Sequence, residues 1–238
     1  MKWISIATVL LVLVSVESTA QITIKTEYFG TSAYRDEHNQ KVGSSKGSAM
    51  VYHGSANLPL SMKKNESNQP TIWGIGLSGD YASLNNKNIA EPLVLSEILN
   101  LQMLLFHVRP LSEKWSMMAS VGVGVYTGDT RFSHLRFRNV LGSAGLVFVR
   151  RILPNLELGA GLALNNAFGY PMAFPALYVN WNYGHKLTCS FSALEGANLA
   201  VGYNVNKTFS ISFITEMGGQ MALTELNGDD KIFTHQYI

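Results

Sequence analysis

The feature that most constrains the fold of this chain is an alternation of side chains with a period of two. In the run 115–126, apolar residues occupy every second position, and mostly small or polar residues lie between them. Alternate side chains of a β-strand point to opposite faces of a sheet, so this run predicts a strand with one apolar face. The pattern recurs at 156–165, 177–182 and 209–213, and helical spacing fits none of these runs.

The same alternation extends along the chain and predicts about 12 strands with no confident helix between them. The expected strands are 22–34, 47–59, 71–83, 96–109, 115–127, 139–151, 155–166, 174–183, 186–194, 197–205, 207–224 and 230–238. Consecutive strands without crossover helices pair antiparallel, which predicts an all-β, up-and-down sheet. Several strands reach the roughly 9–11 residues that a tilted strand needs to cross a bilayer.

Charge is scarce along these strands, which favours a membrane over water. Asp, Glu, Lys and Arg make up 14% of the 238 residues, whereas soluble domains carry about 25%. Between Leu156 and Val205 the only such residues are Glu157, Lys186 and Glu195. A soluble sheet would need charge on its outer face and edges. We therefore expect an antiparallel up-and-down transmembrane β-barrel of about 12 strands, within a range of about 10–14.

The connections between the expected strands differ in length from one end of the sheet to the other. Long polar segments at 36–46, 85–91 and 129–138 alternate with tight turns at 110–113, 152–154, 184–185 and 206–207. Short periplasmic turns and longer outer loops have this asymmetry in outer-membrane barrels. The polar stretch 61–70 is an exception, because it falls at the end that should carry short turns.

The N-terminus predicts export. Lys2 precedes an apolar run from Ile4 to Val16, and small residues follow up to Ala20. This is the layout of a secretory signal peptide cleaved before Gln21. We therefore expect a signal peptide at 1–20, an outer-membrane β-barrel domain at 21–238, and a location in the cell outer membrane. Cys189 is the only cysteine, so neither an intramolecular disulfide nor a lipoprotein signal is expected.

Three segments carry a resemblance to a known family. They are Leu-Ser-Glu-Lys-Trp-Ser at 111–116, Leu-Pro-Asn-Leu-Glu-Leu-Gly-Ala-Gly at 153–161 and Pro-Ala-Leu-Tyr-Val-Asn-Trp at 175–181. Together they resemble an uncharacterised family of outer-membrane β-barrel proteins of Gram-negative bacteria, a domain of unknown function. The resemblance implies a fold and a location, and it transfers no catalytic or ligand residue. Barrel proteins of this kind commonly end on an aromatic residue. This chain ends Gln236-Tyr237-Ile238, so either Tyr237 takes that role or further strands follow.

A search for catalytic and metal-binding motifs gives no site. Phosphate-loop, Cys-x-x-Cys, His-Glu-x-x-His and Gly-x-Ser-x-Gly motifs are missing. His134 beside Ser133 in an expected outer loop is the one candidate for a lipid-acting enzyme, but a triad needs a geometry that sequence does not show. Arg131, Arg136 and Arg138 flank this pair, and they fit a cationic loop that contacts lipopolysaccharide phosphates equally well.

Other polar residues and glycines have structural interpretations. His53, His107 and His185 are too dispersed for metal ligands and are expected at solvated or interfacial positions. Asp229 and Asp230 occupy a Gly-containing turn that lacks the further oxygen ligands calcium needs. Four glycines lie inside strands and are expected to be small lumen-facing positions: Gly122, Gly124, Gly159 and Gly161.

The alternation also predicts which side chains face lipid and which face the lumen. Cys189 falls on the apolar face of its strand, with Leu187 and Phe191. The residues expected on the lipid face are Leu158, Leu162, Val179, Phe209 and Ile211, and those expected in the lumen are Glu157, Asn165, Asn180, Asn182, Ser210 and Ser212.

The predicted function is that of an integral outer-membrane barrel, a small channel or a membrane scaffold. Outer-membrane lipid, lipopolysaccharide and the barrel-assembly machinery are the expected partners, and no catalytic, cofactor or metal site is assigned. A net charge of +2 gives no reason to expect nucleic acid. Two alternatives remain open at this point: a lipid-modifying hydrolase or acyltransferase of the outer membrane, and a secreted soluble β-sandwich or lipocalin-like carrier. The oligomeric state is left open.

Overall fold

The structure of the chain is a computed structural model. It describes residues 21–35, 38–88, 95–131, 134–165, 172–184, 186–193, 197–206, 209–226 and 228–237. The expected signal peptide at 1–20 lies outside the described residues, as do Ser133, His185 and Ile238.

One antiparallel sheet of 12 strands accounts for almost all of the described chain, and each strand pairs with its neighbours in sequence order. The strands are β1 (Gln21–Arg35), β2 (Lys41–Lys64), β3 (Pro70–Lys87), β4 (Glu97–Pro110), β5 (Trp115–Thr127), β6 (Val140–Leu153), β7 (Leu156–Asn165), β8 (Met172–Tyr183), β9 (Leu187–Ala193), β10 (Ala197–Asn204), β11 (Ser210–Leu226) and β12 (Asp229–Tyr237). A short 3₁₀ helix, η2 (Phe137–Asn139), precedes β6. The prediction of an all-β, up-and-down barrel-like sheet with about 12 strands is confirmed.

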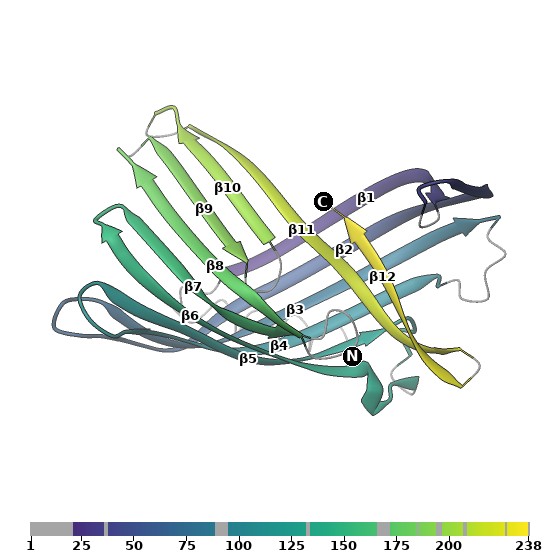
Figure 1. Cartoon of the computed structure of the whole chain (residues 1–238), viewed down its shortest axis with the longest axis horizontal. Helices are drawn as coiled ribbons and strands as arrows, with labels where there is room; N and C mark the ends of the chain where they lie inside the picture. The colour runs from purple at the N-terminus through teal and green to yellow at the C-terminus, as the bar shows by residue number, and fades with distance from the viewer. Residues whose placement is uncertain are drawn as a thin grey trace, which may run out of the picture.

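The sheet is curled instead of flat (Figure 1). Its first and last strands remain edges, since no pairing joins β1 to β12 within the described residues. The strands of the curled sheet therefore have a concave inner face and a convex outer face.

The largest difference from the predicted strands is in the hairpin of β2 and β3. Both strands extend past the expected ends and stay paired from Lys46↔Lys87 to Lys64↔Pro70. Only 65–69 forms the turn, which Asn65 closes by accepting a hydrogen bond from the Gln69 backbone N–H onto its side-chain oxygen, at 2.8 Å. The expected long connection at 61–70 is therefore wrong. Polar composition suggested a loop, but these residues continue the ladder beyond the apolar part of the sheet.

The register confirms that the two faces of the strands differ as the alternation predicts. On the inner face Gly161 pairs with Val147 and Ala176, and the latter two are fully buried. On the outer face Leu162 is 63% exposed. Leu158 and Val179 pair with each other on the outer face, and Phe209 and Ile211 are exposed, as expected. The residues expected in the lumen lie on the inner face, in pairs such as Glu157↔Asn180 and Gly202↔Ser212. The side chain of Asn165 lies outside the described set.

Close approach of two strands explains why Gly161 is a glycine. A Cβ atom at this position would lie 1.9 Å from the carbonyl oxygen of Leu146 in β6. No side chain fits there without moving backbone, so β6 and β7 can pack closely only around a glycine. This agrees with the interpretation of the strand glycines as small inward-facing positions rather than a nucleotide loop.

Candidate functional site

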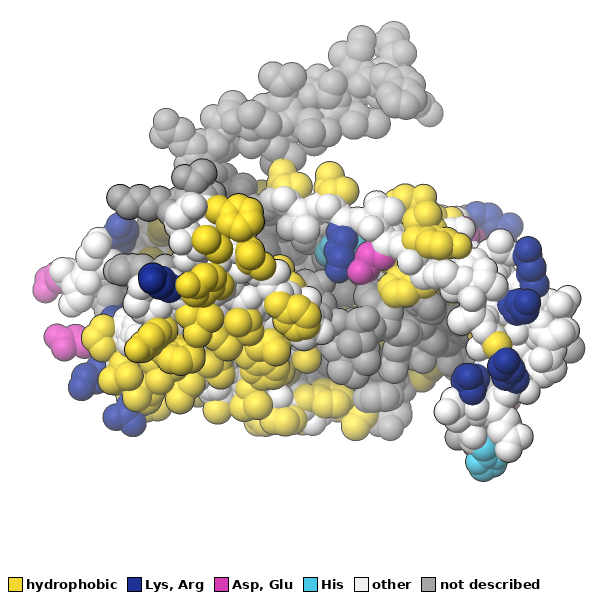
Figure 2. All heavy atoms as spheres, turned by 90° about the horizontal axis from the view of Figure 1, so that it is seen from above, with side chains coloured by type: hydrophobic (Ala, Val, Ile, Leu, Met, Phe, Trp, Pro, Cys, Tyr) yellow, Lys and Arg dark blue, Asp and Glu magenta, His cyan; other side chains and the backbone are white. Residues whose placement is uncertain are grey.

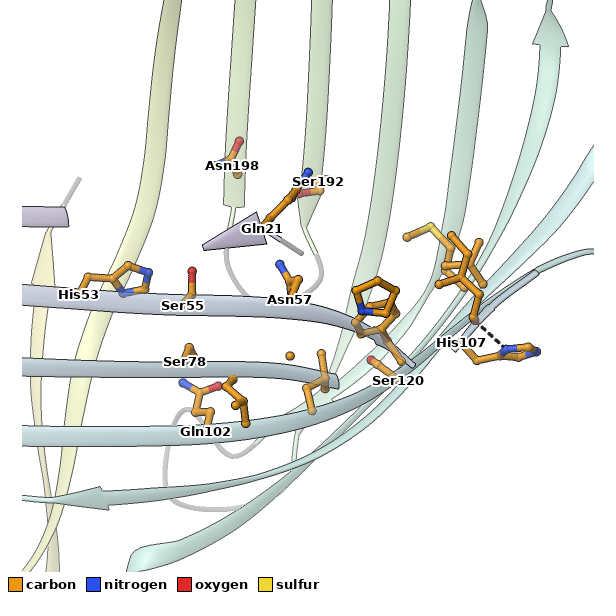
Figure 3. Close-up of a pocket in the computed structure, with 18 of the residues that line it drawn as sticks. Gln21, His53, Ser55, Asn57, Ser78, Gln102, His107, Ser120, Ser192 and Asn198 are labelled. Atoms are coloured by element: carbon orange, nitrogen blue, oxygen red, sulfur yellow. Dashed lines mark hydrogen bonds between the residues drawn. The ribbon is translucent and has the colours of Figure 1, made fainter. Parts of the chain in front are cut away.

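The concave face of the sheet encloses a cavity of about 850 Å³, which is the candidate functional site. Its lining comes from β1 to β5 on one side and from β9 to β11 on the other. Figure 3 shows Ser55 and Asn57 of β2 directed toward the same space as Ser192 of β9 and Asn198 of β10. The cavity is therefore the lumen of the curled sheet, and its walls come from strands far apart in the sequence.

A row of polar side chains crosses the loop end of this cavity. Register places Lys25, His53, Asp80 and Asn100 side by side on the inner faces of β1 to β4. His53 Nδ1 forms an ion pair with Asp80 Oδ1 when the imidazole is protonated. One strand away, Lys25 Nζ lies 3.0 Å from Glu27 Oε1. Each cationic group has an acidic partner, so the row provides donors and acceptors without a large net charge.

Below the polar row, toward the tight turns, the lumen wall becomes apolar. Leu104, Phe106 and Val108 of β4 line the cavity together with Met118 of β5. The ring of Phe106 covers Gly74, where a Cβ atom would lie 2.2 Å from the ring. The lumen is consequently amphipathic, with polar side chains toward its loop end and an apolar wall toward the tight turns.

The upper end of the lumen, next to the longer loops, is occupied by part of β11. This strand pairs with β10 only as far as Met217, and from Gly218 onward it pairs with β12 instead. The second half of β11 crosses to the opposite wall, where Met221 hydrogen-bonds with the side chain of Asn100. Figure 1 shows β11 and β12 passing over β3, β4 and β5.

His134, the residue considered for catalysis, lies in the connection between β5 and β6. Its Nδ1 is 2.7 Å from Asp129 Oδ2. Arg131 binds the same carboxylate with two groups, Nε at 3.0 Å from Oδ1 and Nη2 at 2.7 Å from Oδ2. These hydrogen bonds from Arg131 hold the pKa of Asp129 well below its usual range. Asp129 is thus a loop-ordering carboxylate, and the neighbouring Ser133 lies outside the described residues.

The expected cationic loop is largely neutralised by acidic partners. Arg131 is paired with Asp129, and Arg136 and Arg138 both pair with Glu225 of β11. The arginines therefore connect the loop to itself and to the β11–β12 hairpin. Contact between this loop and lipopolysaccharide phosphates stays a prediction, since Arg131 and Arg136 remain largely exposed beside their acidic partners.

The histidines lie in different environments. His53 is on the inner face in its pair with Asp80, where its side chain lines the cavity and is 32% exposed, which agrees with the expected solvated position. His107 stacks on Trp73 with ring centroids 4.0 Å apart, near the tight-turn end of β3 and β4. Across the part of the chain that the structure describes, no group of three or more His, Cys, Asp or Glu side chains could hold a metal ion.

Sequence reasoning missed the polar row and the two asparagines that hold β11. The alternation does place His53 and Asp80 on the inner sets of their strands, which was the available signal. Their contact depends on the register of the β2–β3 hairpin, and register follows from the turn. Because the turn was expected at 61–70 instead of 65–69, this pairing could not be predicted.

A membrane-spanning helix is absent from the described ranges. No curated protein and no solved structure matches the chain. One family model does match it, over residues 16–238 and thus nearly the whole length, and its description is "Domain of unknown function (DUF6268)". The chain belongs to this family, DUF6268, whose function is unknown.

Proposed function

We propose that the chain is an integral outer-membrane β-barrel protein of a Gram-negative bacterium, exported with a signal peptide at 1–20, whose convex face contacts lipid and lipopolysaccharide. The observation that carries this proposal is a band on the outer face, without Asp, Glu, Lys or Arg, that crosses β1 to β10. We call it the outer band.

Charges on the outer face occur only at the limits of the outer band. Lys46 and Glu97 lie at its loop end, and Arg109 and Arg150 lie at its turn end. Between them the outward positions are mainly large, exposed apolar residues, such as Leu77, Leu101, Met103, Leu105, Val121, Val123, Leu146, Phe148, Leu158, Leu162, Leu164 and Leu177. Figure 2 shows hydrophobic side chains gathered on one flank of the molecule.

A continuous apolar face of this kind is unfavourable in water. Soluble monomers rarely expose apolar patches larger than a few hundred Å², and exposed sheets carry charges that prevent aggregation. A bilayer removes both problems, because lipid tails cover the outer band while pairing on both sides satisfies the backbone of β2 to β10. This favours the membrane over the alternative of a soluble carrier.

Aromatic side chains border the outer band at both ends. Trp73, Trp115 and Trp181 lie on the outer face near the tight turns. Near the loops, Tyr52 and Tyr81 stack on the same face with centroids 6.2 Å apart. Aromatic girdles at these two levels are typical of barrels at the membrane–water interfaces.

Arg150 supports the position of the lower interface. Its guanidinium lies 5.5 Å from the centroid of the Trp115 ring. A cation over an indole is stabilised by the ring's electrons, and a long side chain at this level extends its charge toward headgroups and water. The pair therefore suits the interface at the periplasmic end better than a soluble surface.

Neighbouring positions in β5 test the proposal with a matched control. Val121 is at the middle of the outer band and 57% exposed, whereas Ser120 lines the lumen. Val121→Arg should destabilise the protein folded in lipid vesicles by about 2–4 kcal/mol, because it places a charge near the bilayer midplane. Ser120→Arg should cost much less. Equal costs in a urea titration of the two variants would contradict a lipid-facing outer band.

A further inference from the structure

The second half of β11 is held inside the curled sheet by a buried asparagine on the opposite wall. Asn100 is 2% exposed. Its Nδ2 donates to the carbonyl of Met221 at 2.6 Å, and its Oδ1 accepts from the N–H of the same residue at 3.1 Å. One side-chain amide thereby satisfies both backbone groups of Met221 on the edge of β11 that no longer faces β10.

A second asparagine supports the same crossing. Asn139 of η2 is also buried, and its Nδ2 donates to the carbonyl of Leu223 at 2.8 Å. Two residues further, Glu225 pairs with Arg136 and Arg138 of the connection between β5 and β6. The backbone of β11 is therefore bound at Met221 and Leu223 along one edge, and the side chain of Glu225 adds ion pairs two residues further.

Apolar packing closes the space beneath the crossing strand. Ala222 is fully buried in one cluster with inward-facing residues of β2, β3 and β4. The members of this cluster are Ala49, Val51, Ala82, Leu84, Leu95, Ile98 and Ala222. The cluster lies above the polar row of the lumen, at the loop end. It separates that row from the outer loops with tightly packed apolar side chains.

We propose that the β11–β12 hairpin is an internal plug that closes the loop end of the barrel, so the protein in this state does not conduct. The inference deepens the proposed function and rests on it for the consequence in a membrane. The position of the hairpin itself does not depend on lipid. Gly218 and Gly219, where β11 changes partners, are the point about which the hairpin would move.

The sequence of β12 supports a place away from lipid. It is Asp-Asp-Lys-Ile-Phe-Thr-His-Gln-Tyr, so each of its two alternating sets contains polar or charged residues. In β7, by contrast, one of the alternating sets is entirely Leu and Ala. A strand facing lipid needs one such apolar set, which β12 lacks.

Single-channel recording on the refolded protein in planar bilayers tests the plug. The wild-type protein should be closed nearly all the time. Asn100→Ala removes both amide hydrogen bonds to Met221 and leaves its backbone N–H and C=O without partners in the closed state. Because unsatisfied buried polar groups destabilise that state, the open probability should rise at least about tenfold. Asn180→Ala is the matched control, since Asn180 is an asparagine on the inner face of β8, paired in register with Glu157 and Ser190, and is not among the residues that line the cavity. A wild-type pore that is steadily open, or equal responses of the two variants, would overturn the proposal.

Cross-linking in detergent gives a second readout that needs no conductance. Arg138→Cys with Glu225→Cys, in a chain carrying Cys189→Ser, should be joined by a short bis-maleimide because the two side chains form an ion pair and both are partly exposed. Ala160→Cys with Glu225→Cys should not be joined, since Ala160 is on the outer face of β7. Absence of the first cross-link in folded protein overturns the plug. Its presence in a protein that stays soluble and enters no bilayer would support the hairpin position and contradict the membrane function instead.

Discussion

Paired charges order the lumen and the outer loop at the scale of single residues. His53 with Asp80 joins two neighbouring strands, whereas Lys25 with Glu27 lies within β1 and Asp129 with Arg131 lies within one loop. Alternation alone shows which face of a strand a residue occupies. It does not show which residue lies opposite, because that depends on register, and an error of a few residues in one turn removes the contact.

The loop carboxylate gives a prediction in acid. Because Arg131 lowers the pKa of Asp129, the folded protein should keep Asp129 ionised well below the usual value of about 3.9. The contribution of Asp129 to loop order is complete above the unfolded-state pKa and is lost only as the pH falls from there through the folded-state pKa. Carboxyl carbon chemical shifts followed during an NMR titration in micelles would measure this.

Arg131→Gln is the matched variant, since it keeps a hydrogen-bonding side chain but removes the charge. The pKa of Asp129 should rise in this variant. An Asp129 that titrates near pH 4 in the wild-type protein would show that the bidentate contact does not form in solution.

Strands were predicted well where both faces have a distinct composition, and less well at their ends. The limits of β5 agree with the prediction, and those of β7 agree within one residue. The ends of β2 and β3 were missed because the paired residues beyond the outer band are polar, as loop residues are. The bend of β11 was also missed, since its alternation continues through the point where the strand changes partners.

The ninth strand gives a prediction that depends on the facing of a whole element. Cys189 pairs with Trp181 and Val201 on the outer face of the sheet. If this face contacts lipid, a bulky charged maleimide should not label the folded protein in intact outer membranes. A membrane-permeant maleimide, or prior denaturation, should restore labelling, as mass spectrometry would show.

Thr188→Cys in a Cys189→Ser background is a control one position along the same strand. Thr188 shares the inner face with Gly202, so its thiol should react with hydrophilic reagents that enter the lumen. Rapid labelling of Cys189 by the charged reagent, with protection at 188, would mean that the facing of β9 is inverted.

The whole-molecule fold was predictable because period-two alternation, tight turns and the absence of crossover helices all indicate one antiparallel meander. The sequence contains less information on where the two edge strands of the sheet lie and on what fills the lumen. Both depend on contacts between residues more than 100 positions apart, such as Asn100 with Met221. A buried asparagine in a strand gives no sign of its partner until the sheet has curled.

Location in the cell tests the central claim, that the outer band contacts lipid. Cells producing the full chain should be fractionated, and the protein should be recovered from outer membranes only with detergent. Its N-terminus should be Gln21, and unheated samples should migrate differently from boiled samples on a denaturing gel, because a sheet paired along 12 strands resists unfolding until it is heated. Recovery of the same chain from the periplasm as a monomer without detergent would contradict the account.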